Sequence, residues 1–362
     1  MSLSHILAAL IAASSSSSIL KSVQTGEITI AAGASSGTAT INAVNTGRSI
    51  CLFNGWRSAD TSLVTTEDYI RVDLTDSTTV TAQTNSSNAA TSRIARYTIV
   101  EFDPDAIKSV QQSTIAIGGS NTSATATITA VDTTRAFVVH LGQTHSTNNT
   151  NFNYNQGRLD LTNATTVTAQ KDSGSNPTLT VGFAVLEFRA GIIKSIQQIT
   201  ALTILAANTT QDATITAVDD TASLLVWGGF GAHLFANADP RYMPYVYRTS
   251  TTNVRAARTQ SSFVETLINC TVVEFYPRWV KSRQAAQTQI ASGQSSANAT
   301  ITAINTDKAF LSWLSHTCSA NVTGDEAVYT TAKINSATQV TINRGGTPAN
   351  TVTNSWEVME FV

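Results

Sequence analysis

His140 is the first residue to consider for chemistry, because a histidine can act as a general base or a metal ligand near neutral pH. The same place in three other segments of the chain, 86 or 87 residues apart, holds Phe53, Trp227 and Trp313. A position that takes a bulky ring each time is typical of packing, so we predict a core or half-buried role for His140. The other histidines occupy different places in their segments: His5, His145, His233 and His316.

Carboxylates are the next candidates, because paired Asp or Glu side chains can carry acid–base chemistry. Asp73 and Asp160 each lie in an Arg-x-Asp pattern, in which residues two apart share a strand face and can form a surface ion pair. A Glu-Phe pair also recurs, with its glutamates at Glu101, Glu187, Glu274 and Glu360. We predict that this glutamate pairs with a repeat-specific Lys or Arg, and we predict no catalytic residue and no enzyme activity.

The three cysteines could in principle form disulfides or hold a metal ion. Cys51, Cys270 and Cys318 lie far apart, at different places in their segments, and show neither domain-by-domain pairing nor metal-ligand spacing. We therefore interpret them as buried free thiols and predict no metal and no cofactor, while their role stays open.

The most individual stretch of the chain runs from residue 228 to residue 247 and is rich in aromatic side chains. Tyr, Phe and Arg are enriched where proteins contact partners or sugars. The preferred interpretation is that this stretch folds over its own domain or an adjacent subunit, and the alternative is contact with a partner or a glycan. The residues in question are Phe230, Phe235, Arg241, Tyr242, Tyr245 and Tyr247.

Internal repetition is the strongest signal in the sequence, and it must be found before the elements are assigned. The openings of four segments share a Lys-Ser-x-Gln pattern, and their lysines are 87, 86 and 87 residues apart: Lys21, Lys108, Lys194 and Lys281. A second anchor is the strand-like run that begins at Thr38, Thr125, Asp212 and Asn298, and the closing Glu-Phe is the third. Three anchors with one period indicate four tandem copies.

Each copy reads as a set of short strands. In the second copy Ala126, Ile128 and Ala130 alternate with threonines, which is the period-two pattern of a half-buried strand. About six or seven such strands separated by turn signals predict an all-β chain of four antiparallel β-sandwich domains, Ig-like or jelly-roll-like. The predicted segments are 1–18 for an N-terminal docking segment and 19–105, 106–191, 192–278 and 279–362 for the repeats.

The joints between copies are short and constant, with seven residues from each closing Glu to the next opening Lys. Such joints predict a semi-rigid rod or arc of domains. A Glu-Lys contact across each joint would add at most about 1 kcal/mol.

Charge is scarce, because Asp, Glu, Lys and Arg make up 13% of the residues against roughly 25% in ordinary soluble proteins. The 22 basic and 24 acidic residues form no basic run, so nucleic acid is not expected as a partner. The apolar stretch from Ile6 to Ala13 lacks a preceding Lys or Arg and is too short to span a bilayer as a helix. We expect no membrane contact and predict that it docks on a partner subunit through Ile6, Leu7, Leu10 and Ile11.

The motifs Ile-Lys-Ser-Val-Gln-Gln, Ala-Thr-Ile-Thr-Ala-Val-Asp-Thr-Thr and the closing Val-Glu-Phe, set in Ser/Thr-rich repeats with few lysines, suggest a family. The sequence resembles β-sandwich proteins of tailed-bacteriophage virions, such as head decorations, collars, fibres and tail appendages. The resemblance implies a homo-oligomer, with a trimer preferred, that contacts other virion proteins. It also implies assembly in the host cytoplasm and a final location in the virion.

Three functions compete at this point. The leading hypothesis is a non-enzymatic virion structural protein that decorates or projects from the capsid, collar or tail. The second is a receptor-binding fibre or adhesin that recognises host-surface glycans through the Tyr242 to Tyr247 region. The third is a depolymerase, for which the repeats offer no paired acids.

Overall fold

The computed structural model describes residues 18–61, 69–85, 91–146, 156–174, 178–232, 240–261, 265–322 and 324–362. Its described residues are almost entirely strands, and each repeat contributes six of them, which is within the number predicted. The strands of the first two repeats are β1 Leu20–Ile30, β2 Ser36–Thr40, β3 Ser49–Ser58, β4 Arg71–Leu74, β5 Thr79–Gln83, β6 Arg93–Phe102, β7 Ile107–Ile117, β8 Ser123–Thr127, β9 Ala136–His145, β10 Arg158–Asn163, β11 Thr166–Gln170 and β12 Leu179–Phe188.

The third and fourth repeats follow the same order, and short helical turns join some of the strands. Their strands are β13 Ile193–Ile204, β14 Thr210–Thr214, β15 Ser223–Ala232, β16 Tyr245–Ser250, β17 Asn253–Ala257, β18 Thr266–Phe275, β19 Val280–Ile290, β20 Ser296–Thr300, β21 Ala309–Cys318, β22 Thr330–Ser336, β23 Gln339–Arg344 and β24 Val352–Phe361. The helical turns are the 3-10 segments η1 Thr46–Arg48, η3 Pro240–Tyr242, η4 Pro277–Trp279 and η5 Thr306–Lys308, and the α-helix α3 Asp325–Val328.

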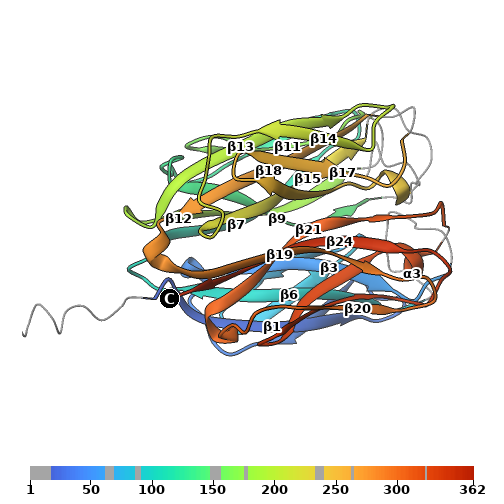
Figure 1. The fold of residues 1–362 in the computed structure, drawn as a ribbon, viewed down its shortest axis with the longest axis horizontal. Coiled ribbons are helices and arrows are strands. Elements are labelled where there is room, and N and C mark those ends of the chain that lie inside the picture. Colours follow the sequence, from blue (N-terminus) through green and yellow to red (C-terminus); the bar gives the residue numbers. More distant parts are fainter. Residues whose placement is uncertain are drawn as a thin grey trace, which may run out of the picture.

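The strands form four six-stranded antiparallel sheets in a four-blade, propeller-like arrangement (Figure 1). Every sheet is shared by two repeats, because each repeat gives its first, sixth and third strands to one sheet and its second, fifth and fourth strands to the next. The all-β prediction is confirmed. Four separate sandwich domains are not, because no six-stranded sheet belongs to one repeat alone.

The repeats close into a ring, so the predicted rod or arc is wrong. The fourth strand of each repeat pairs with the third strand of the next, and the last seam joins β22 of the fourth repeat to β3 of the first. We call these four contacts seams, and each has one residue pair: Arg71 with Gly142, Arg158 with Gly229, Tyr245 with Ser315, and Thr331 with Gly55. The reason lies in the edge strands, whose unpaired N–H and C=O groups would face solvent in a rod and are partly satisfied in a ring.

Each seam depends on a residue with positive φ in the third strand. The φ angles are 89° at Gly55, 89° at Gly142, 101° at Gly229 and 74° at Ser315. A Cβ atom on Gly142 would lie 2.2 Å from the backbone oxygen of Ile70 across the seam. The close approach of two backbones therefore requires glycine at residue 142, whereas the seam between repeats 3 and 4 has Ser315 at the equivalent place.

We predict that Gly142→Ala lowers the free energy of unfolding by about 2 kcal/mol or more, because backbone strain and a clash with a backbone oxygen add together. Gly293 is the control: its φ is 75°, and an added Cβ would meet no atom within 4 Å. Guanidinium unfolding of both variants measures the difference. Equal effects of Gly142→Ala and Gly293→Ala would show that the seam tolerates a side chain.

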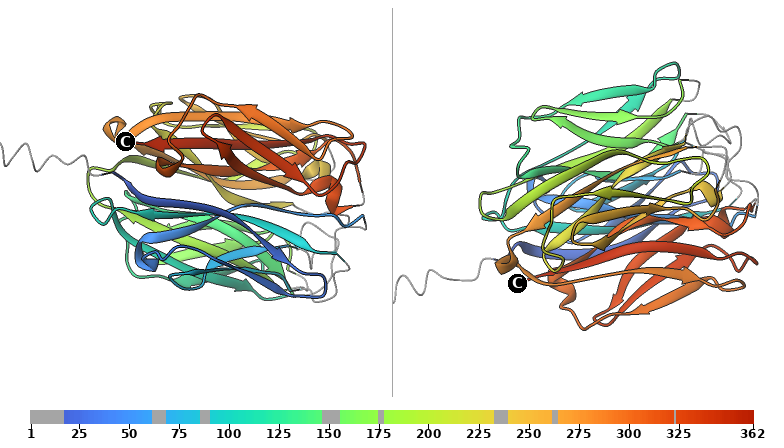
Figure 2. Two further views of the ribbon diagram at one scale, coloured as in Figure 1. Left: turned by 90° about the horizontal axis from the view of Figure 1, so that it is seen from below. Right: turned by 45° about the horizontal axis from the view of Figure 1, so that its top comes forward.

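The two ends of the described chain meet at one end of the ring. Ser18 Oγ donates a hydrogen bond to the Val362 carbonyl oxygen at 3.0 Å, and the Val362 N–H donates to Trp279. α3 lies at the opposite end (Figures 1 and 2). The ring therefore has a terminal end and a loop end. The predicted docking residues Ile6, Leu7, Leu10 and Ile11 lie outside the described residues.

The ring axis is filled by a hydrophobic cluster to which all four repeats contribute. Its centre holds the phenylalanines of the four closing Glu-Phe pairs, with centroid distances of 5.3, 5.8 and 5.2 Å between successive rings: Phe102, Phe188, Phe275 and Phe361. Repeats 2 and 4 each have a further core of their own between their two groups of strands.

Candidate functional site

The polar residues of the repeated motif form one network in each repeat. In the second repeat Lys108 Nζ donates to Glu187 Oε1 at 2.8 Å, and the Asp132 N–H donates to the same oxygen at 3.0 Å. The glutamate side chain is 1% exposed and the lysine side chain 50% exposed. The equivalent ion pairs are Lys21 with Glu101, Lys194 with Glu274, and Lys281 with Glu360.

The predicted pairing of the closing glutamate is thus confirmed, but a Glu-Lys contact across the joints is wrong. Each pair lies within one repeat, because the first and last strands of a repeat are neighbours in one sheet. The recurring carboxylates therefore hold strands together.

The recurring glutamine of the same motif clamps the two groups of strands of a repeat. Gln111 Nε2 donates to the Thr129 carbonyl oxygen at 2.9 Å, and Gln111 Oε1 accepts from the Thr129 N–H at 2.7 Å. The same pair of bonds recurs between Gln24 and Asn42, Gln197 and Thr216, and Gln284 and Thr302. The motif that defines the repeats is thus structural in all four copies.

This network predicts a loss of stability in acid. Burial tends to raise the pKa of Glu274, but hydrogen bonds from Lys194, the Asp219 N–H and Ser195 outweigh it, and the pKa lies below its ordinary value of 4.5. The same balance lowers the pKa of Glu360. The unfolded chain therefore binds more protons than the fold in this range, so the stabilisation is complete above about pH 4.5 and is lost as the pH falls through the folded pKa.

We expect the free energy of unfolding in urea to fall steeply below about pH 4.5 and to fall less steeply in Glu274→Gln. Glu265, which lies outside the network, supplies the control variant Glu265→Gln. A Glu274→Gln profile with the same slope as the wild type would contradict the assignment.

The ring axis brings together the four aligned bulky residues Phe53, His140, Trp227 and Trp313, which line two small axial cavities. His140 is half-buried, and its Nδ1 accepts a hydrogen bond from the Gly142 N–H at 3.0 Å. Burial lowers the pKa of His140 to about 4. The predicted packing role of His140 is confirmed.

The loop-end side of the axis holds an aromatic cluster that the sequence analysis missed. Trp56 and Tyr329 stack with centroids 4.1 Å apart, and Tyr329 donates a hydrogen bond to Tyr69 between their hydroxyls at 2.9 Å. His316 packs against Tyr329 and is 2% exposed, and burial lowers its pKa to about 3. The two axial cavities have about 50 Å³ each, which holds a few waters but not a ligand of ordinary size.

Where it is described, the individual stretch of the third repeat is largely buried, and its turn η3 contacts β21 of the fourth repeat. Phe230 and Tyr242 are 4% and 8% exposed, so neither offers a contact surface. Tyr245 and Tyr247 are half-buried on β16 and stack with centroids 5.7 Å apart, and Arg241 is half-buried in η3. Phe235 lies outside the described residues. A partner or glycan role for these residues stays a prediction.

Of the two predicted Arg-x-Asp ion pairs, the structure contains one. Arg71 and Asp73 form the expected ion pair, but Arg158 pairs with Asp172 and not with Asp160. The prediction for Asp160 was wrong because Asp172, just beyond the neighbouring strand β11, presents its carboxylate to the Arg158 guanidinium. The interpretation of the three cysteines as buried free thiols is confirmed.

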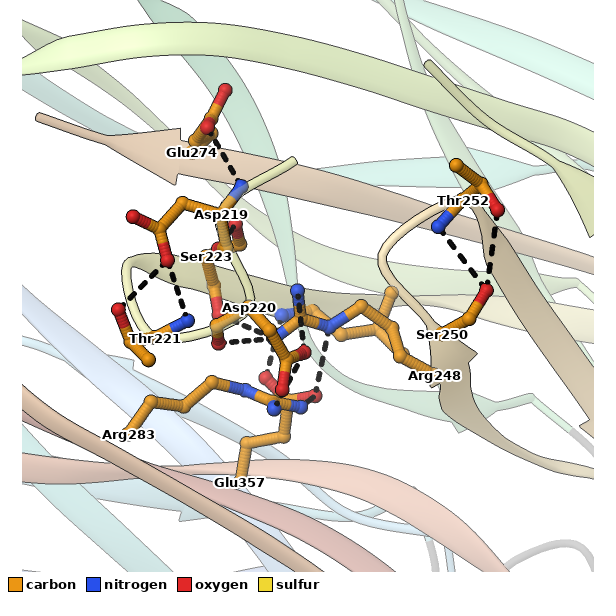
Figure 3. A network of polar contacts seen from close by, with 11 residues as sticks. Asp219, Asp220, Thr221, Ser223, Arg248, Ser250, Thr252, Glu274, Arg283 and Glu357 are labelled. Carbon is orange, nitrogen blue, oxygen red and sulfur yellow. Dashed lines mark hydrogen bonds and ion pairs between the residues drawn. The ribbon is translucent and has the colours of Figure 1, made fainter. Parts of the chain in front are cut away.

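A charged cluster stands at the seam between repeats 3 and 4 (Figure 3). Arg283 bonds to Glu357 and, at 3.2 Å, to Asp220, and Arg248 Nε lies 3.7 Å from Glu357 Oε1. The side chains of Arg248 and Glu357 are each 1% exposed, and that of Asp220 is 54% exposed. Arg248 also donates to the Ser223 carbonyl oxygen at 2.8 Å, and Glu357 Oε2 accepts from the Leu225 N–H at 2.8 Å.

This cluster has no counterpart at the next seam around the ring. Val23, Thr98, Thr306 and Ile334 hold the equivalent places at the seam between repeats 4 and 1. The signal that could have found the cluster is a charged residue at a repeat position that is otherwise apolar, such as Arg248 against Leu74, Leu161 and Ile334.

Within the described ranges no group of three or more His, Cys, Asp or Glu side chains is placed to hold a metal ion. None of the helical segments described above has the length and apolar character needed to cross a membrane. Comparison with protein-family models and with curated proteins gave no match.

Proposed function

We propose that the chain is a non-enzymatic structural protein of a tailed-bacteriophage virion, where it decorates or projects from the capsid, collar or tail. The observation that carries the proposal is the closed ring with both described ends of the chain at one end of its axis. Such a ring can be held at its terminal end by other virion proteins while its loop end faces outward. The sequence resemblance supplies the virion context.

The chemistry of the repeats supports a structural role. The polar residues that recur in all four copies, Lys, Gln and Glu of the motif, are engaged in bonds that hold strands together. In this proposal each repeat is a two-layer sandwich unit of three strands against three, completed by its neighbours in the ring. The N-terminal segment 1–18 docks on the particle, and a homo-oligomer, with a trimer preferred, forms in the host cytoplasm during assembly.

Immunogold labelling of purified phage particles tests this proposal directly. Antibodies raised against the ring should label particles at a regular position, and deletion of residues 1–17 should abolish labelling while the purified ring still unfolds at the wild-type temperature. Particles that carry no label would refute a virion location. Sedimentation of the purified protein gives the oligomeric state.

A second function, recognition of a host-surface glycan, is favoured by one specific feature. Tyr245 and Tyr247 form a stacked pair on β16 and are only half-buried, and aromatic rings with a polar end are common in sugar contacts. We propose that these two tyrosines, and not the buried Tyr242, form the contact. Particles whose protein carries Tyr245→Ala and Tyr247→Ala should adsorb poorly to host cells, and unchanged adsorption would count against this function.

A further inference from the structure

A groove of about 580 Å³ opens at the seam between repeats 3 and 4, on the side of the charged cluster. Its volume lies within the range of about 300–1,000 Å³ that small-molecule sites usually have, in contrast to the axial cavities. Its lining includes Tyr247, Arg248, Ala285, Gln287 and Glu357, together with the hydroxyl residues 249–251 at the end of β16 and the start of the turn that follows. The groove therefore combines two aromatic residues, Tyr247 and Trp356, with charged groups and several hydroxyls.

The groove is open because a side chain found at other seams is missing. The fourth residue after the opening lysine is Gln112 in the second repeat and Gln198 in the third, and both reach across their seams. Gln198 Nε2 donates to the Leu161 carbonyl oxygen, and Gln198 Oε1 accepts from the Leu161 N–H, both at 3.3 Å. In the fourth repeat this residue is Ala285, whose methyl group cannot fill the space.

The Leu161 N–H and C=O groups that bond to Gln198 have equivalents at Arg248, which lines the groove. Leu161 pairs with Val167 in its hairpin, and Arg248 pairs with Val254 at the same register position of the next repeat. Because neighbouring repeats share this register, the Arg248 N–H and C=O point toward the space that a carboxamide fills at the other seam. A ligand for this place must present one acceptor and one donor side by side, as two neighbouring hydroxyls of a sugar ring do.

The seam between repeats 4 and 1 provides an internal comparison. Thr25 stands at the place of Ala285, and the groove there is smaller, about 380 Å³. Its equivalents of Arg248, Arg283, Glu357 and Asp220 are neutral: Ile334, Val23, Thr98 and Thr306. Of these two grooves, the one between repeats 3 and 4 joins aromatic rings to arginines and to the Asp220 carboxylate, which is 54% exposed. Charged groups of this kind bind hydroxyl groups strongly.

We propose that this groove binds a hexopyranose unit of a glycan, with two adjacent sugar hydroxyls bonded to the Arg248 backbone and the sugar ring against Tyr247. The groups that define the site are the backbone of Arg248 and the side chains of Tyr247, Ala285 and Gln287. The inference rests on the second proposed function and names its site.

Saturation-transfer NMR of the purified full chain with the methyl glycosides of glucose, galactose and mannose tests the proposal. At least one sugar should receive saturation from the wild type. Ala285→Gln, which introduces the residue that Gln112 and Gln198 supply at two other seams, should raise the apparent Kd at least tenfold, as should Tyr247→Ala. Thr25→Gln makes the matching change at the seam between repeats 4 and 1 and should leave binding unchanged.

The outcomes distinguish failure of the groove as the binding site from failure of glycan recognition as the function. Binding that persists in Ala285→Gln overturns the groove as the site while glycan recognition stands. No transfer to any of the three sugars overturns both. Loss of binding in Ala285→Gln with an unchanged melting temperature, and retention in Thr25→Gln, supports the groove.

Discussion

Replacing Glu357 with alanine is expected to lower the free energy of unfolding by about 3–5 kcal/mol, because it removes one partner from a buried ion cluster. Arg248 and Arg283 would remain with side chains 1% and 9% exposed, and Asp220, which is 54% exposed, would be their only acidic partner in the cluster. Burial already lowers the pKa of Arg248, since it disfavours the charged guanidinium. Urea unfolding at pH 7 measures the change, and a loss below about 1 kcal/mol would contradict it.

A matched variant distinguishes the cost of an unpaired charge from the cost of altered packing at the seam. The residues at the seam between repeats 4 and 1 show that Ile, Val and Thr fit these places. The triple variant Arg248→Ile, Arg283→Val and Glu357→Thr therefore removes the buried charges and leaves only Asp220, whose side chain is 54% exposed. Buried ion pairs can often be exchanged for apolar residues at little cost. We expect the triple variant to unfold within about 1 kcal/mol of the wild type.

If both results hold, the cluster contributes specificity more than stability. Four similar repeats could join in the wrong order or with a second copy of the chain, because each presents the same kind of edge at its fourth strand. Arg248 placed against a neutral neighbour such as Val23 or Thr98 would be a buried unpaired charge. The cluster therefore favours pairing of repeat 3 with repeat 4 alone, which fixes the order of the ring.

The sequence predicted the local structure of the repeats well. The alternation that includes Ala126 indicated a strand, although β8 ends at Thr127 and leaves Ile128 and Ala130 outside it. The recurrence of a bulky ring at His140 indicated its packing role, and the recurrence of Lys108 and Glu187 suggested an ion pair. These features each lie within one repeat, and four copies of each pattern separate them from chance. The polar network of the motif is therefore readable from the chain.

The ring and the seam cluster were not predicted, and the reason is physical. Each seam has a single backbone pair, such as Thr331 with Gly55, so no long alternating pattern marks the pairing in sequence. The sequence does carry one signal for the seams, a glycine two residues after the bulky ring at Gly55, Gly142 and Gly229. A glycine there indicates a positive φ and the close approach of another backbone. The constant seven-residue joints between repeats are compatible with a ring as well as with a rod, so they did not distinguish the two arrangements.

The second large effect is expected at the centre of the ring, where Phe188→Ala should lower the free energy of unfolding by about 3–5 kcal/mol. Phe188 is 1% exposed, and its ring lies within 6.1 Å of those of Phe102, Phe137 and Phe275, which come from three different repeats. The strands that carry these rings are held in three different sheets, which limits their collapse into the cavity. Leu205→Ala is the control, because Leu205 is 50% exposed and its loss should change stability by no more than about 0.5 kcal/mol.

Calorimetry of the same variant also distinguishes a ring from separate domains. In a closed ring the axial cluster belongs to all four repeats, so Phe188→Ala should shift one cooperative transition as a whole, with calorimetric and van't Hoff enthalpies that agree. In a chain of independent domains it would shift the melting of the second repeat and leave the others in place. A split transition in Phe188→Ala would therefore show that the axis does not couple the four repeats.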